Sequence, residues 1–119
     1  MEKFQPHNLE NREELNLMNL LVRHKASTFF FRVNGVSMAD AAMDEGDIII
    51  VDRAVELYHD CRVVCFIDGE YTVKRVEMLK GKIRLMPCNE LNTKYKPIEV
   101  TLDDNFVIWG VVTYVIKKM

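Results

Sequence analysis

Two short segments of the chain carry residue types that could act together in hydrolysis. Ser37 follows Gly35 in a turn, where the missing Cβ of glycine lets the backbone bend sharply and leaves the serine exposed. A serine hydroxyl is a weak nucleophile until a base takes its proton. A lysine that burial makes neutral near pH 7 can act as that base, because desolvation penalises the ammonium form.

The lysine candidate is Lys74, which lies in the strand-like segment Thr72 to Val76. Successive strand side chains alternate, so Lys74 and Arg75 take opposite faces and one of them points toward whichever face is covered. Arginine stays charged on burial, so only the lysine could become a base. Alternation does not decide which cation is inward. Both could extend to solvent from an edge strand, and Ser37 could be an ordinary turn serine.

Two other patterns of serine hydrolase are disfavoured. The sequence around Ser37 fits the Gly-x-Ser-x-Ala form of a nucleophile elbow, but that fold needs alternating strands and helices over a longer chain. A Ser-His-Asp triad would have to use His59, the only histidine after Ser37, with Asp47 or Asp52. The residues on either side of His59 are polar and typical of a turn, so a surface histidine is the better interpretation.

The elements that must position these residues are mainly strands. One amphipathic helix is predicted from about Asn11 to Val22, with Asn11 and Glu14 as a capping box. Asp68-Gly69 between two apolar runs predicts a hairpin. Many short strands with regular turn residues indicate a mainly β fold, either an antiparallel sandwich or a partly open barrel. The predicted strands are Thr28–Val33, Asp47–Asp52, Arg62–Ile67, Tyr71–Val76, Lys82–Met86, Pro97–Leu102 and Phe106–Ile116.

Length and composition predict one soluble globular domain. The chain has 119 residues, of which 49% are hydrophobic and 29% are charged. We expect a flexible N-terminal arm over residues 1–10 and a single domain over residues 11–119. The net charge of −2, without a concentrated basic face, argues against direct sequence-specific DNA binding. Neither a signal peptide nor a membrane-spanning run is visible, which favours a cytoplasmic location without membrane contact.

The cysteines do not suggest a metal or redox site. Cys61, Cys65 and Cys88 are odd in number, and the spacing of the first two does not fit a CxxC pair. Residues four apart in a strand share a face, so Cys61 and Cys65 are expected to point the same way. We interpret them as reduced core cysteines and expect no metal and no cofactor.

Taken in order, these segments resemble the UmuD and LexA-type peptidases, the self-cleaving Ser–Lys enzymes of the bacterial DNA-damage response. The resemblance runs from about Thr28 to Val115, and the spacing of Ser37 and Lys74 agrees with the family pattern. It implies a LexA/signal-peptidase-like fold with one short N-terminal helix. The matching segments are Phe31–Met38, Asp44–Asp52, Asp68–Arg75, Leu85–Asn89 and Ile108–Val112.

The resemblance also implies roles and partners. Ser37 would be the nucleophile and Lys74 its base, and the backbone amides of Ser37 and Val36 would form the oxyanion hole. In the family, the substrate is the protein's own N-terminal arm, cut at a small-residue–Gly bond when a RecA filament favours the docked arm. The trimmed homodimer then joins a UmuC-like DNA polymerase in error-prone translesion synthesis. A homodimer, a UmuC-like polymerase and a RecA filament are therefore the expected partners.

The chain departs from the family in its N-terminal segment. No Ala-Gly or Cys-Gly bond occurs in residues 1–36, and Phe4 and Pro6 match residues just after the family's cleavage point. We therefore expect a form that is already processed. A non-catalytic dimerisation or interaction module stays open as an alternative, as does the peptidase domain of a LexA-type repressor, although no helix-turn-helix domain is visible. A signal peptidase would need a membrane anchor and is disfavoured.

The last predicted strand, Phe106–Ile116, gives a physical reason to expect the homodimer. It is almost continuously apolar apart from Thr113, so a one-sided sheet would leave a hydrophobic stripe in water. A partner usually covers such a stripe or an open strand edge. The alternative cover is the N-terminal helix of the same chain, through Leu15, Met18 and Leu21.

Overall fold

The computed structural model describes residues 8, 10, 16–34, 43–87, 97–100 and 107–119. These residues form one seven-stranded sheet, a short α-helix and a 3-10 turn. The predicted mainly β fold of short antiparallel strands with one short N-terminal helix is confirmed, and the strands form an open sheet. The elements are α1 (Leu17–Leu21), η1 (Lys25–Ser27), β1 (Thr28–Arg32), β2 (Ile48–Asp52), β3 (Arg62–Ile67), β4 (Glu70–Leu79), β5 (Lys82–Pro87), β6 (Ile98–Val100) and β7 (Val107–Ile116).

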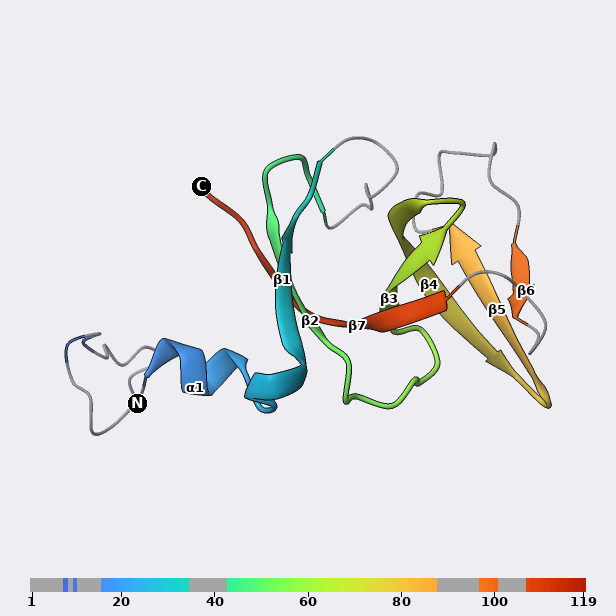
Figure 1. Ribbon diagram of the computed structural model, residues 1–119, viewed down its shortest axis with the longest axis horizontal. Coiled ribbons are helices and arrows are strands. Elements are labelled where there is room, and N and C mark those ends of the chain that lie inside the picture. Colours follow the sequence, from blue (N-terminus) through green and yellow to red (C-terminus); the bar gives the residue numbers. More distant parts are fainter. Residues whose placement is uncertain (1–7, 9, 11–15, 35–42, 88–96, 101–106) are drawn as a thin grey trace, which may run out of the picture.

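The strand order is β1-β2-β7-β3-β4-β5-β6, and neighbouring strands are antiparallel. Strand β7 pairs with β3 up to Val111 and with β2 from Val111 onward. The sheet therefore has two parts. We call β1, β2 and the end of β7 the β1–β2 half, and β3 to β6 with the start of β7 the β3–β6 half. Figure 1 shows β7 running between the two parts, with α1 projecting beyond β1.

Two irregularities bend β7 where the halves meet. The register with β3 skips Trp109, and the register with β2 skips Thr113. An extra residue in one strand of an antiparallel pair increases the local twist and bends that strand. The two halves therefore diverge along β7 instead of forming one flat sheet.

Hairpins with tight turns build the β3–β6 half. Asp68 and Gly69 both have positive φ values, 51° and 81°, as the two-residue hairpin turn favoured by strand twist requires. The predicted Asp-Gly hairpin is confirmed. The next turn passes through Gly81, whose φ is 72°. Strand β3 has the predicted bounds, whereas β4 extends beyond the predicted Tyr71–Val76 at both ends.

Two apolar clusters form the core. Alternation along β3 puts Val63 in one cluster and Val64 in the other, and both are fully buried. Cys61 and Cys65 are buried free thiols, and both lie in the cluster that contains Val63. The prediction of reduced core cysteines is confirmed for these two, and Cys88 lies outside the described residues. The first cluster contains Val33, Met43, Ile49, Val51, Val64, Val73 and Val112, and the second Cys61, Val63, Cys65, Val76, Leu85 and Val111.

Helix α1 contributes little to this core. It begins after Asn16, whose side chain accepts a hydrogen bond from the Met18 amide at 2.9 Å. The predicted capping pair, Asn11 and Glu14, lies outside the described residues, as do Phe106 and Leu102 at the bounds of two predicted strands. None of the five residues of α1 is buried. No helix in the described part of the chain is long and apolar enough to cross a membrane.

Candidate active site

The structure decides which of the two neighbouring cations is inward. Lys74 is buried, with 8% of its surface exposed, and lies in the middle of β4 opposite Val63 of β3 and Pro87 of β5. Arg75 takes the other face, where its guanidinium donates to the Asp60 carboxylate at 2.8 Å. The inward cation is therefore the lysine, the only one of the two that can give up its proton.

The face of β4 that carries Lys74 is largely apolar, although it also carries Thr72. Lys74 shares it with Val76, and the strand pairing brings in Val63, Cys65 and Leu85, all of them fully buried. Burial raises the pKa of the Cys65 thiol to about 12, while the charge of Lys74 acts in the opposite direction. The thiol is thus neutral at pH 7. Lys74 therefore lies on the covered face of β4, beside buried apolar side chains.

The predicted nucleophile and oxyanion hole, Ser37 and Val36, lie outside the described residues. The Ser37–Lys74 distance therefore stays a prediction. The structure does describe the two ends of the segment that carries Ser37. Val33 precedes it and Met43 follows it. Both side chains are buried in the first apolar cluster, with Val64 and Val73, and not in the second cluster, which lies on the Lys74 face of β4.

Backbone hydrogen bonds join these two ends. The Val33 amide donates to the Asp47 carbonyl at 2.7 Å, and the Gly46 amide donates to the Val33 carbonyl at 2.9 Å. Gly46 has a φ of 91°, so the turn before β2 uses a conformation that favours glycine. Backbone hydrogen bonds therefore join Val33, before this segment, to Gly46 and Asp47, which follow it and precede β2.

Lys117, which was not predicted from the sequence, bonds to the turn that precedes β2. Lys117 Nζ donates to Asp44 Oδ2 at 2.9 Å and also to Asp47 Oδ2. The Asp47 carboxylate accepts a further hydrogen bond from the Asp44 amide at 2.8 Å. This amide and Lys117 hold the pKa of Asp47 below its ordinary value, and the two carboxylates raise the pKa of Lys117. The partners are 70 residues apart, so no local pattern indicates the pairing.

A second buried carboxylate, Asp52, is also fully bonded. Its oxygens lie 2.6 Å from His24 Nδ1, 3.1 Å from Ser27 Oγ and 2.8 Å from the Ala54 amide. Burial acts to raise the pKa of Asp52, but these hydrogen bonds outweigh it and hold the value below the ordinary one. The cluster ties the segment after α1 to the end of β2. No local sequence pattern indicates this cluster, because His24 and Asp52 are 28 residues apart.

His59 is a surface histidine, as predicted. Its side chain is 57% exposed, its Nδ1 accepts a hydrogen bond from the Met78 amide at 3.0 Å, and its nearest carboxylate is Asp60 at 3.6 Å. Asp47 and Asp52, the acids considered for a triad, are bonded to Lys117 and His24. Among the described residues, neither of these two acids is therefore paired with His59.

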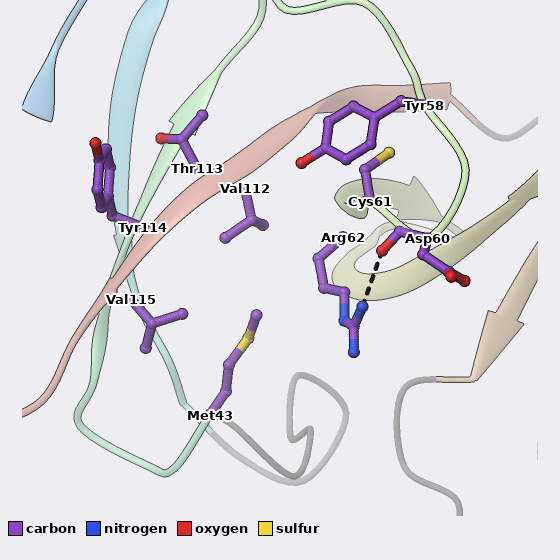
Figure 2. Close-up of a pocket in the computed structure, with 9 residues that line it drawn as sticks. All are labelled: Met43, Tyr58, Asp60, Cys61, Arg62, Val112, Thr113, Tyr114 and Val115. Carbon is purple, nitrogen blue, oxygen red and sulfur yellow. Dashed lines mark hydrogen bonds between the residues drawn. The ribbon is translucent and has the colours of Figure 1, made fainter.

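An open pocket of about 250 Å³ lies where β7 leaves β3. Pairing of β7 with β3 ends at Val111, while pairing with β2 continues to Ile116, so a gap opens between β7 and the start of β3. In Figure 2, Met43, Val112 and Val115 converge on this pocket. Its lining residues are Met43, Tyr58, Asp60, Cys61, Arg62, Val112, Thr113, Tyr114 and Val115.

We found no metal centre in the described residues. Among the residues that the structure describes, no three His, Cys, Asp or Glu side chains lie close enough together to hold an ion.

Comparison with known proteins identifies the family. Residues 3–113 match the peptidase S24-like family. Protein MucA of Escherichia coli is 42% identical over 105 residues, which cover 87% of this chain and 68% of MucA. Protein SamA of Salmonella typhimurium is 39% identical over 106 residues, covering 89% of this chain and 71% of SamA. The LexA repressor of Hahella chejuensis is 39% identical over 77 residues, covering 65% of this chain and 37% of the repressor. The chain therefore belongs to the peptidase S24-like family, and its predicted likeness to the UmuD and LexA-type peptidases is confirmed.

Proposed function

We propose that the chain is a serine endopeptidase with a Ser37–Lys74 dyad, which acts as a UmuD-like accessory subunit in error-prone translesion DNA synthesis. The observation that carries the catalytic part is the burial of Lys74 on the covered, largely apolar face of β4, while Arg75 points to the opposite face. Membership of the peptidase S24-like family supports the same chemistry.

In the proposed mechanism, the Ser37 hydroxyl attacks a peptide carbonyl and its proton passes to Lys74 Nζ. The amides of Ser37 and Val36 stabilise the oxyanion of the tetrahedral intermediate. When the intermediate collapses, the C–N bond breaks and the leaving amine takes the proton from Lys74. A water molecule then attacks the acyl-enzyme with Lys74 again as base, which releases the acid and regenerates the serine.

The edge of β7 beside the pocket is the proposed docking edge of the substrate chain, although Lys74 is not among the residues that line the pocket itself. The pocket opens next to Met43, which follows the segment carrying Ser37, and among the described strands only β2 pairs with β7 over Val112 to Ile116. The other edge of that stretch of β7 thus faces the pocket. An extended peptide can bond to such an edge as an added strand.

The cellular role rests on family likeness. Similarity to MucA, SamA and a LexA repressor supports a place in the SOS response to DNA damage. The proposed partners are a UmuC-like DNA polymerase and a RecA filament in the cytoplasm. Direct recognition of DNA by this chain is not part of the proposal, since its net charge is −2.

We also propose a homodimer that uses the β1–β2 half. Phe30 of β1 is 74% exposed and Tyr114 of β7 is 44% exposed on the same face of the sheet, with the buried Ile50 of β2 between them. Helix α1 reaches only the edge of this surface: Leu20 and Leu21 line a second pocket with Thr113 and Tyr114. Such an apolar surface is usually covered by a partner. It also supports the alternative of an interaction module without present catalysis.

Peptide cleavage tests the proposed dyad. A peptide with an Ala-Gly bond is incubated with wild type and with the variants Ser37→Ala and Lys74→Ala. We expect each variant to lose cleavage by about a thousandfold or more, because nucleophile and base act as a unit. Arg75→Ala and His59→Ala are the matched controls and should cleave at nearly the wild-type rate. Cleavage that survives Lys74→Ala but is lost in His59→Ala would contradict the mechanism.

Sedimentation at micromolar concentrations tests the dimer. Wild type should sediment as a dimer, whereas Phe30→Ser and Tyr114→Ser should shift it toward the monomer mass of 13.9 kDa. Phe66→Ser removes an aromatic side chain from β3 that is about as exposed as Tyr114, and it should leave the dimer intact. A wild-type chain that stays monomeric on concentration would contradict the assembly.

A further inference from the structure

The turn between the Ser37 segment and β2 is held by a charge from the far end of the chain. Lys117, directly after β7, bridges the carboxylates of Asp44 and Asp47. Asp44 is largely exposed, but the Asp47 side chain is buried. A buried carboxylate is costly unless it is paired and hydrogen-bonded, so Lys117 supplies what Asp47 needs.

Asp47 in turn fixes both ends of the segment that carries Ser37. Its carbonyl accepts the Val33 amide on the near side, and its carboxylate accepts the Asp44 amide on the far side. Val33 and Met43 pack in one apolar cluster with Val112 of β7. Polar and apolar contacts therefore both anchor the base of this segment to the strand that leads to Lys117.

We propose that Lys117 is a positioning residue for the reaction: through Asp44 and Asp47 it holds the two described ends of the segment that carries Ser37, at Val33 and Met43, against β7. This rests on the proposed function, in which Ser37 is the nucleophile. Lys117 acts through the turn and does not touch the peptide. Small displacements of a reacting group cost large factors in rate, so loosening this base lowers turnover more than it weakens binding.

Steady-state cleavage of the Ala-Gly peptide by Lys117→Met, Lys117→Arg and Lys118→Met tests the assignment. Lys117→Met removes the charge and retains much of the apolar stem, and we expect kcat to fall by about tenfold with little change in KM. Lys117→Arg can still pair with both carboxylates and should recover most of kcat. Lys118→Met removes the neighbouring exposed cation and should behave as wild type. An unchanged kcat in Lys117→Met, or an equal loss in Lys118→Met, overturns the proposal.

Hydrogen exchange of the Val33 and Gly46 amides gives a second readout that needs no catalysis. Both amides bond across the base of the segment, so Lys117→Met should speed their exchange while Lys118→Met leaves it unchanged. Faster exchange supports the positioning role, and unchanged exchange overturns it. If wild type and Ser37→Ala both fail to cleave the peptide, the proposed function fails, and the exchange rates still decide whether Lys117 holds the segment's base.

Discussion

In the β3–β6 half of the sheet, β3, β4 and β5 pair in the order in which the chain makes them. In the β1–β2 half, β2 pairs with β7, which comes from the other end of the sequence. The first half is joined by tight turns and packed around fully buried residues such as Leu85. The second is tied together by two buried carboxylates, Asp47 and Asp52, whose partners are remote in the chain. Local pairing builds one half, and long-range contacts build the other.

The proposed dyad is divided between these halves. Lys74 lies in β4 of the β3–β6 half, while Ser37 follows β1 in the sequence. Strand β7, which pairs with both halves, fixes how they are placed. A change that disturbs β7 is therefore expected to affect the dyad, whereas a change confined to one surface is not.

Matched truncations of one core residue in each half should give the largest effects. Ile49 lies in β2 of the β1–β2 half and Leu85 in β5 of the β3–β6 half, and both are fully buried. Ile49→Ala and Leu85→Ala should each lower the free energy of unfolding by about 2–5 kcal/mol. Urea unfolding followed by circular dichroism and by Trp109 fluorescence checks this. Both variants should unfold in one transition, and two separate transitions would show that the halves are independent.

A methyl group at Gly110 should disturb the junction of the halves. A Cβ there would lie 2.7 Å from Val51 Cγ1, and Val51 is fully buried. Overpacking of this kind costs about 1–3 kcal/mol, so we expect Gly110→Ala to lose this much stability and to slow peptide cleavage.

The double variant Gly110→Ala/Val51→Ala is the control for that clash. It removes the side chain that the new methyl group meets, so the two substitutions together should cost less than the sum of their separate effects. The free energies of unfolding of wild type, both single variants and the double variant are measured in urea. If the two losses of stability simply add, the clash of the new methyl group is not with Val51.

Acid should weaken the β1–β2 half through its two carboxylates. The folded pKa values of Asp47 and Asp52 lie below the ordinary value of 3.8. Their contribution to stability is therefore complete above about pH 4 and is lost as the pH falls below it, because the unfolded chain takes up protons first. The urea midpoint should fall steeply below that pH. Asp52→Asn should be less stable than wild type at pH 7, but its urea midpoint should change less as the pH falls, and Ser27→Ala should be intermediate. If the midpoint of Asp52→Asn fell with pH as steeply as that of wild type, Asp52 would not be the source of the acid sensitivity.

The smallest effect is expected at Arg75. Its ion pair with Asp60 is partly exposed to solvent, and such pairs contribute less than about 1 kcal/mol. Thermal unfolding of Arg75→Met should therefore stay close to wild type. A large loss of stability would show that the outward face of β4 matters as much as the inward face that carries Lys74.

Much of the fold could be predicted because its signals are local. The apolar runs located the seven strands, with β3 at its observed bounds, and Asp68-Gly69 specified a turn that requires positive φ at both residues. The ordered motifs indicated the family. One strand was predicted too short: β4 extends beyond Tyr71–Val76 because pairing with β3 recruits Glu70 and pairing with β5 recruits Glu77 to Leu79.

The sequence by itself determined that Lys74 and Arg75 lie on opposite faces of a strand, since alternation is a property of the extended backbone. Only the tertiary structure decided that the lysine is the inward one, because the covered face depends on which strands pack around β4. The partners of Asp47 and Asp52 were likewise decided by folding. A carboxylate in the sequence does not specify its cation, and Lys117 meets Asp47 only because β7 returns across the sheet to lie beside β2.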